Sequence, residues 1–236
     1  MDPLLISAAS GMKSRMESLD MLANNIANSG TTGFKGDREL NGLFRDQLPL
    51  VQKQWTDFTQ GTLAPTGNAL DLGLSGAGFF ALNSPAGVVY TRGGDFQISK
   101  TNQLQTADGY TLRNVLDNGK PIVVDPTQPI GRNKSGVVQQ SGQTSGQIAI
   151  ASIPTASDTL SKLGKTYFAL MNNSQPAGPA PATEVHQGTL EQSNVPVADA
   201  AVKLVGVMRQ FEMLQRAMAL GSEMNKRAFD EVARVS

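Results

Sequence analysis

The stretch LDMLANNIANSGTTGFK, Leu19–Lys35, begins as an amphipathic helix and then places Asn24, Asn25 and Asn28 where an apolar seam is still running. Asparagine is unfavourable inside a helix because its short amide competes for backbone hydrogen bonds. Asn and Gly both tolerate the left-handed conformation in which many helices end. We therefore interpret the three asparagines, together with Ser29, Gly30 and Gly33, as a helix exit.

Working outward from this exit, apolar residues recur with heptad spacing on both sides of a long central region. Pro3 suits a first helical turn, and the spacing predicts a helix from Pro3 to about Ala27. The same spacing predicts a second helix at the end of the chain. The predicted assembly seams are Leu5, Met12, Met16, Leu19 and Ile26 on the first helix, and Leu204, Val207, Phe211, Leu214 and Met218 on the second.

The central region is rich in Gly, Pro, Thr, Ser, Asn and Gln and contains short β-type runs with turn signals such as Asp108-Gly109 and Asn118-Gly119. We predict an antiparallel β domain at 67–186, with a Pro-rich extended connector at 172–183. Residues 29–66 have no clean period and are predicted as an irregular linker. The candidate strands are residues 79–82, 87–91, 96–99, 122–124, 136–139, 147–153 and 167–171.

The predicted fold class is therefore α+β. An N-terminal helix at 1–28 and a C-terminal helix at 187–236 form a coiled-coil-like helical domain beside the β domain. The C-terminal helix pairs either with the N-terminal helix or with neighbouring subunits, and spacing alone leaves both open. Methionine packs adaptably, which suits helices that meet several different neighbours.

Composition excludes several classes of function. The chain has 236 residues, with Lys+Arg and Asp+Glu both at 20, so no excess charge attracts nucleic acid or an anionic membrane. It contains no cysteine, which removes disulfides, thiolate metal sites and cysteine nucleophiles. No run approaches the ~18 apolar residues of a membrane span, and the start lacks a basic region typical of a cleaved signal peptide.

Two phosphate-loop patterns and one histidine are the only leads toward an enzyme. Residues 76–81, GAGFFA, fit the dinucleotide fingerprint, but Pro and β-branched residues follow where a helix is required, so we interpret them as a glycine turn in the β domain. Gly164-Lys165-Thr166 lacks the first glycine of a phosphate loop, because Thr159 stands there. His186 is the only histidine. We expect no catalytic residue, no cofactor and no metal; a nucleotide-binding oxidoreductase and a soluble adaptor or export chaperone are the alternatives.

The stretch around the helix exit closely resembles the N-terminal signature of the flagellar axial family, the rod and hook proteins of the bacterial flagellum. Further segments are similar to that family's motifs in the same order: LSGAGFFAL, YTRGGDF and GTLEQSNV. The resemblance covers nearly the whole chain. The residues that carry it are Asn25, Ile26, Ala27, Asn28, Gly33, Phe34, Gly76, Gly78, Phe79, Phe80, Tyr90, Thr91, Arg92, Leu190, Glu191, Ser193, Asn194 and Val195.

The resemblance implies a non-enzymatic, self-assembling subunit of the basal-body rod, which transmits torque from motor to hook. It implies export by the flagellar type III apparatus without signal cleavage, assembly in the periplasm, and other rod proteins, including the distal rod, as partners. The run RQFEM, Arg209–Met213, resembles proximal rod members more than distal ones. A distal rod or hook-type protein is the alternative within the family.

Overall fold

The computed structural model describes residues 3–43, 49–153, 156–171 and 178–235. The chain divides into two compact units. The first consists of Met1–Ala27, Asp37–Thr56 and Val195–Ser236, and the second of Asn28–Gly36 and Asp57–Asn194. Each unit is thus built from segments that lie far apart in the sequence.

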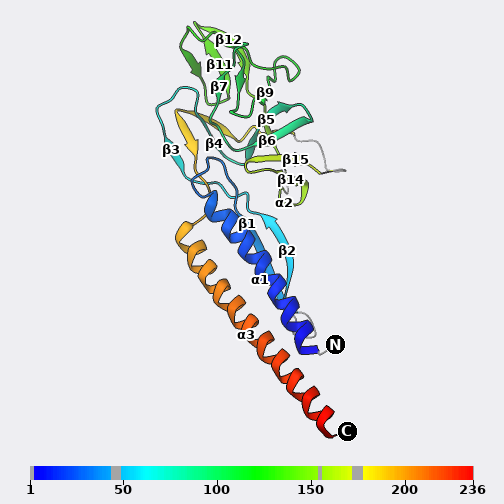
Figure 1. The fold of residues 1–236 in the computed structure, drawn as a ribbon. Coiled ribbons are helices and arrows are strands. Elements are labelled where there is room, and N and C mark those ends of the chain that lie inside the picture. The colour runs from blue at the N-terminus through cyan, green and yellow to red at the C-terminus, as the bar shows by residue number, and fades with distance from the viewer. Residues whose placement is uncertain (1–2, 44–48, 154–155, 172–177, 236) are drawn as a thin grey trace. The chain divides into compact units, whose positions relative to one another are not determined.

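The first unit contains the two long helices, α1 (Pro3–Ala27) and α3 (Val197–Val235). They pack side by side and run in opposite directions, so both chain ends lie at the same end of the pair (Figure 1). Pro3 opens α1, and Asp199 lies in the first turn of α3, where a carboxylate suits the helix dipole. The predicted boundary of the first helix is confirmed.

A β-hairpin completes the first unit. Its strands, β1 (Asp37–Leu43) and β2 (Pro49–Thr56), pair antiparallel with one bulge between Leu40 and Asn41, and both contact α1. The prediction of an irregular linker at 29–66 is wrong for the residues of this hairpin. Strand pairing and contact with a helix stabilise these residues, and neither leaves a clean hydrophobic period in the sequence.

The second unit is built of antiparallel strands. Its nine-stranded sheet has the order β14-β15-β6-β5-β9-β8-β7, with β13 paired to both β5 and β16. The strands of this sheet are β5 (Gly78–Ser84), β6 (Gly87–Thr91), β7 (Gln97–Ile98), β8 (Leu104–Gln105), β9 (Thr111–Leu112), β13 (Ile150–Ser152), β14 (Leu160–Leu163), β15 (Tyr167–Leu170) and β16 (Gly178–Pro179).

The second unit also contains three smaller sheets. Its one described helix, α2 (Ala156–Thr159), is a single helical turn. Two of the smaller sheets join early and late parts of the chain: β3 (Leu63–Pro65) pairs with β18 (Thr189–Glu191), and β4 (Leu72–Ser75) pairs with β17 (Glu184–Gln187). The β-rich unit therefore extends beyond the predicted range 67–186 at both ends. The remaining sheet contains β10 (Ile130–Arg132), β11 (Val137–Gln140) and β12 (Gln143–Gln147).

The prediction of a central antiparallel β domain with N- and C-terminal helices is confirmed. The run 87–91 coincides with β6, whereas the run 122–124 forms no strand and takes part in a single isolated bridge, between Val123 and Gln103. Asn118 and Gly119 have φ values of 47° and 81°, as the predicted tight turn requires. Residues 172–177 of the predicted connector lie outside the described residues.

β5 separates two hydrophobic clusters. Phe80 and Leu82 point into one, while Phe79 and Ala81 point into the other with Phe168. Successive side chains of a strand alternate between its faces, so burial on both faces explains the unbroken apolar run FFAL. No helix of the described part of the chain is long and apolar enough to cross a membrane.

Candidate functional site

At the helix exit predicted from the asparagines, the side chain of Asn25 forms hydrogen bonds to strand β1. α1 ends at Ala27, and Asn25, which is 6% exposed, forms two hydrogen bonds with the backbone of Asp37. Asn25 Nδ2 donates to the Asp37 carbonyl at 2.7 Å, and the Asp37 N–H donates to Asn25 Oδ1 at 2.9 Å. The amide therefore anchors the start of β1 on α1.

In the second unit, Gly33 lies directly against the backbone of the YTRGG segment. Its φ is 67°, and a Cβ added there would lie 2.2 Å from the backbone N of Gly93. Its N–H donates to the Glu191 carbonyl at 2.8 Å. Only glycine fits both this conformation and this approach. The next residue, Phe34, is fully buried, with Lys162 Nζ 4.4 Å from its ring centre.

Lys35, Arg92 and Glu191 form a buried charge cluster. The carboxylate of Glu191 lies 2.6 Å from Lys35 Nζ and 3.1 Å from Arg92 Nη1, and the three side chains are at most 2% exposed. Lys35 Nζ also donates to the Thr59 carbonyl at 2.6 Å, and the Gly61 N–H donates to Glu191 Oε1 at 2.9 Å. The charge cluster joins three segments that are distant in sequence.

One carboxylate thus serves two buried cations. Burial lowers the pKa of Lys35 and of Arg92, and the negative charge of Glu191 opposes that shift. Taking charges out of water costs several kcal/mol per ion, which close pairing offsets only while every partner is present. The charge cluster is therefore a point where loss of one side chain leaves a buried charge unbalanced.

The glycine motif supports this cluster rather than a nucleotide. Arg92 Nη2 donates to the Gly76 carbonyl, and the Arg92 guanidinium lies 5.1 Å from the centre of the Phe79 ring. A Cβ on Gly78 would lie 2.5 Å from Ile150 Cγ2. The strand β5 begins at Gly78 where a dinucleotide site requires a helix. Our interpretation of these residues as a turn in a β domain is confirmed.

Asn194 is a second link between the early and late segments. Its Oδ1 accepts from the Gly36 N–H at 2.9 Å, and its Nδ2 donates to the Asp57 carbonyl at 2.7 Å and to the Thr59 carbonyl at 3.1 Å. These contacts, made three residues after the end of β18, hold Gly36, Asp57 and Thr59 together within the second unit. The sequence had suggested no partner for Lys35, Thr59 or Gly61.

The other residues of the family motifs lie in several environments. Thr91 Oγ1 donates to the Thr166 carbonyl at 2.8 Å and accepts from the Gly93 N–H, which fixes the turn after β6. Tyr90 and Phe80 are buried in opposite hydrophobic clusters. Asn28 is buried, Ala27 is exposed, and Ile26, Leu190, Ser193 and Val195 are half-buried.

The predicted seam of α3 is half-buried at each of its five positions, among residues that are mostly exposed. On α1, Met12, Leu19 and Ile26 are half-buried, Met16 is 53% exposed, and the side chain of Leu5 lies outside the described residues. The most buried stripe of α1 is a different one, which the sequence analysis missed because it is small and polar. It contains Gly11, Ser14, Ser18, Met21, Leu22 and Asn25.

Two residues of that stripe form hydrogen bonds to strand β1 of the hairpin. Ser18 Oγ donates to Glu39 Oε1 at 2.6 Å, and Asn25 bonds to Asp37. Small side chains let a strand approach a helix closely, so α1 uses one face for the hairpin and another for α3. The spacing of Gly11, Ser14 and Ser18, three and four residues apart, was the signal available in the sequence.

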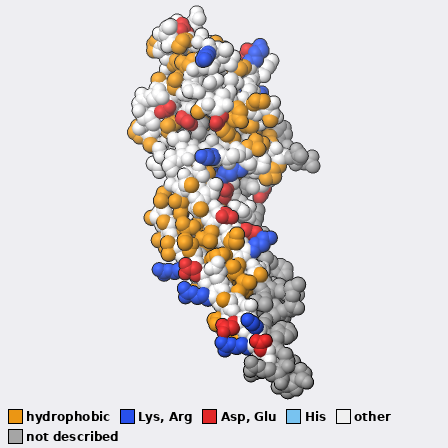
Figure 2. All heavy atoms as spheres, viewed as in Figure 1, with side chains coloured by type: hydrophobic (Ala, Val, Ile, Leu, Met, Phe, Trp, Pro, Cys, Tyr) orange, Lys and Arg blue, Asp and Glu red, His pale blue; other side chains and the backbone are white. Residues whose placement is uncertain are grey.

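Both helices also expose apolar side chains. Figure 2 shows hydrophobic side chains gathered over the helix pair on the face in view. On α3, Val202, Met213, Leu220 and Met224 are between 60% and 74% exposed. Contiguous exposed apolar surface of this kind marks interaction sites. Within the described ranges, no three His, Cys, Asp or Glu side chains are placed to hold a metal, and His186 lies in β17.

Three family models match successive parts of the chain. Residues 5–35 match the flagella basal body rod protein model, residues 73–150 match the D1 domain model of the flagellar hook protein FlgE/F/G, and residues 186–230 match the C-terminal model of the flagellar basal body rod FlgEFG protein. The first and last matches contain most of α1 and α3.

Curated relatives match over almost their entire length. The chain is 30% identical to the flagellar basal-body rod protein FlgF of Caulobacter vibrioides, with 100% of both chains covered. It is 32% identical to FlgG of Bacillus subtilis, covering 93% of this chain and 95% of that one, and 31% identical to FlgF of Rhizobium meliloti, covering 91% of each. The chain belongs to the flagellar basal-body rod proteins of the FlgF/FlgG type.

Proposed function

We propose that this chain is a structural subunit of the proximal part of the flagellar rod, which joins other rod proteins in the shaft that carries torque from motor to hook. Its role as a basal-body rod subunit follows from the family. The observation that carries the assembly role is the apolar surface of the helix pair, where side chains such as Met213 and Leu220 are 60% and 62% exposed.

The helix pair supports a role in the inner layer of the rod. α3 buries one stripe against α1 and exposes a second, and an isolated subunit gains nothing from the exposed one. In the assembled rod, neighbouring helices cover it with coiled-coil-like packing. The β-rich unit has its own two hydrophobic clusters, and we infer that it forms an outer layer of the assembled rod.

The proximal assignment rests on the run RQFEM in α3, Arg209–Met213, which resembles proximal rod members. The relatives include proteins named FlgF and proteins named FlgG, so the distal rod is the second candidate. Deletion of the gene followed by electron microscopy of isolated basal bodies separates them. A rod that stops near its base supports the proximal role, a rod that lacks only its distal part supports the distal one, and intact hooks and filaments contradict both.

A structural rod subunit has no catalytic activity and lies outside the cytoplasm. We infer a non-enzymatic protein, exported by the flagellar type III apparatus and assembled in the periplasm, with no nucleic-acid partner and no membrane insertion. Balanced charge and the absence of cysteine support this. Saturable binding of a dinucleotide to the purified protein, lost in a Gly78→Ala variant that still folds, would contradict it.

A further inference from the structure

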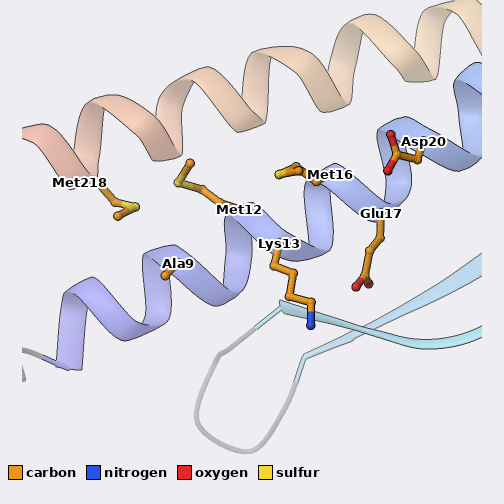
Figure 3. Close-up of a pocket in the computed structure, with 7 residues that line it drawn as sticks. All are labelled: Ala9, Met12, Lys13, Met16, Glu17, Asp20 and Met218. Carbon is orange, nitrogen blue, oxygen red and sulfur yellow. The ribbon is translucent and has the colours of Figure 1, made fainter.

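The helix pair contains an apolar groove on the α1 side. It has a volume of about 400 Å³, and the side chains of Met12, Met16 and Met218 point into it from both helices (Figure 3). Its rim carries Lys13, Glu17 and Asp20, which are all exposed. Lys13 offsets the charge of Glu17, so Asp20 leaves the rim with one net negative charge. We name these six residues, together with Ala9, the methionine groove.

A second feature lies on another face of α3. Val202, Met213, Leu220 and Met224 fall within roughly 40° of one another around the helix axis, at 100° per residue. The half-buried stripe that contains Met218 lies roughly 130–150° away by the same count. We name the four exposed residues the outer stripe. The exposed cations Arg209 and Arg216 lie along one side of it.

We propose that the outer stripe of one copy docks into the methionine groove of a second copy. The inference rests on the proposed rod function and names the contact by which two subunits join. The groove runs from Ala9 to Asp20, which is eleven residue steps or about 16 Å of helix. Three residues of the stripe, Met213, Leu220 and Met224, cover the same eleven steps, and Val202 lies further toward the start of α3. The part of the stripe from Met213 to Met224 therefore matches the groove in length.

Chemistry matches as well as length. Thioether side chains adapt to the shape of an incoming Leu or Met, because they are unbranched and flexible. The negative Asp20 at the rim complements Arg216 beside the stripe. A second copy supplies both the apolar surface and the charge that the methionine groove lacks.

The groove and the stripe lie on different faces of one subunit, so the contact is heterologous. A heterologous contact leaves one unused groove and one unused stripe on every pair, and growth continues unless the rotation closes a ring. An open helical assembly, as a rod requires, follows from this geometry without an additional interface.

Cysteine cross-linking tests the contact in the full chain, because the protein has no cysteine of its own. Two variants, Met16→Cys and Leu220→Cys, are purified separately and oxidised alone and mixed. We expect disulfide-linked dimers in the mixture and at most a tenth as many from either variant alone. Gln215→Cys, an exposed position off the stripe, is the matched control in place of Leu220→Cys. No excess of dimer in the Met16/Leu220 mixture overturns the proposal.

A charge exchange gives an independent measurement. Asp20→Arg and Arg216→Asp should each weaken self-association in sedimentation velocity by roughly fivefold, and the double variant should restore it. Lys226→Asp, an exposed change on another side of α3, should leave it unchanged. If the single variants abolish the rod in cells while the double variant and the cross-link both fail, the rod function stands and the second copy is overturned as the partner.

Discussion

Asn25 and Asp37 are joined by two hydrogen bonds, in which the side-chain amide of the first pairs with both backbone groups of the second. A neighbouring β-strand would bond to the N–H and C=O of Asp37 in the same manner. The last turn of α1 therefore takes the place of a strand beside the first residue of β1. The amide that weakens the helix is therefore the group that positions β1.

Replacing Asn25 and Asn28 by Ala should impair rod assembly more than it lowers the melting temperature of the β-rich unit. Loss of the Asn25 amide leaves two backbone groups of Asp37 without their partner, at a cost of about 1–3 kcal/mol if they stay buried. Amide exchange in β1 reports the local loss, and motility reports assembly. Lys226→Ala is the control, at an exposed position of α3 outside the methionine groove and the outer stripe. Equal damage to rod assembly and to the melting temperature of the β-rich unit would argue for a purely local folding role.

Gly33→Ala should destabilise the β-rich unit far more than Gly67→Ala. Both glycines have φ near +70°, so each alanine pays a similar backbone strain of about 1 kcal/mol. A Cβ at Gly33 also meets the backbone of Gly93 at 2.2 Å, whereas a Cβ at Gly67 has open space. Urea unfolding followed by far-UV circular dichroism measures the difference in stability between the two variants. Equal unfolding midpoints would contradict the close approach of Gly33 to the backbone of Gly93.

Glu191→Gln should cost about 3–5 kcal/mol, because it leaves Lys35 and Arg92 buried without their shared carboxylate. The matched control is Glu184→Gln, whose ion pair with Lys134 at 3.2 Å is largely exposed and contributes at most about 1 kcal/mol. Urea denaturation of both variants measures the contrast. Similar losses in the two variants would show that the charge cluster is not the stabilising element.

Alkaline pH should destabilise the protein partly through Tyr167. Burial, together with the hydrogen bond that its hydroxyl donates to Asp108 at 2.6 Å, raises the pKa of Tyr167 above 10.0. The folded state then keeps the proton while the unfolded state loses it, so this contribution is complete below pH 10.0 and is lost as the pH rises further. Tyr167→Phe should flatten the fall in unfolding free energy above pH 10. Tyr110→Phe, whose ring lies 4.9 Å from that of Tyr167, controls for packing.

Amide exchange of the isolated subunit should be slow in β5 and fast along α3. Phe80 and Leu82 of β5 are fully buried, whereas α3 is half-buried on one stripe only. The measurement requires a monomer verified by sedimentation, because assembly covers the helices. Strong protection of both chain ends in that monomer would contradict helices that depend on neighbours.

The amino-acid sequence alone determined the existence of the two long helices, most candidate strands and the turn at Asn118-Gly119. Each depends on the period or chemistry of a few consecutive residues, which act locally whatever surrounds them. The seam of α3 is of this kind, because one apolar stripe on a long helix needs no knowledge of its partner to be visible. The predicted start of the second helix at 187 was wrong, because residues 189–191 form β18 and α3 begins at Val197.

Only the tertiary structure decided the hairpin of β1 and β2, the face of α1 that lies against it, and the charge cluster. Ser14 and Ser18 are hydrophilic, yet they are the buried side of α1 because a strand approaches there. Lys35 and Glu191 are 156 residues apart, and each alone reads as an ordinary surface charge. Their burial depends on β18, which contains Glu191, pairing with β3 and bringing Glu191 to Lys35, and sequence spacing carries no record of that pairing.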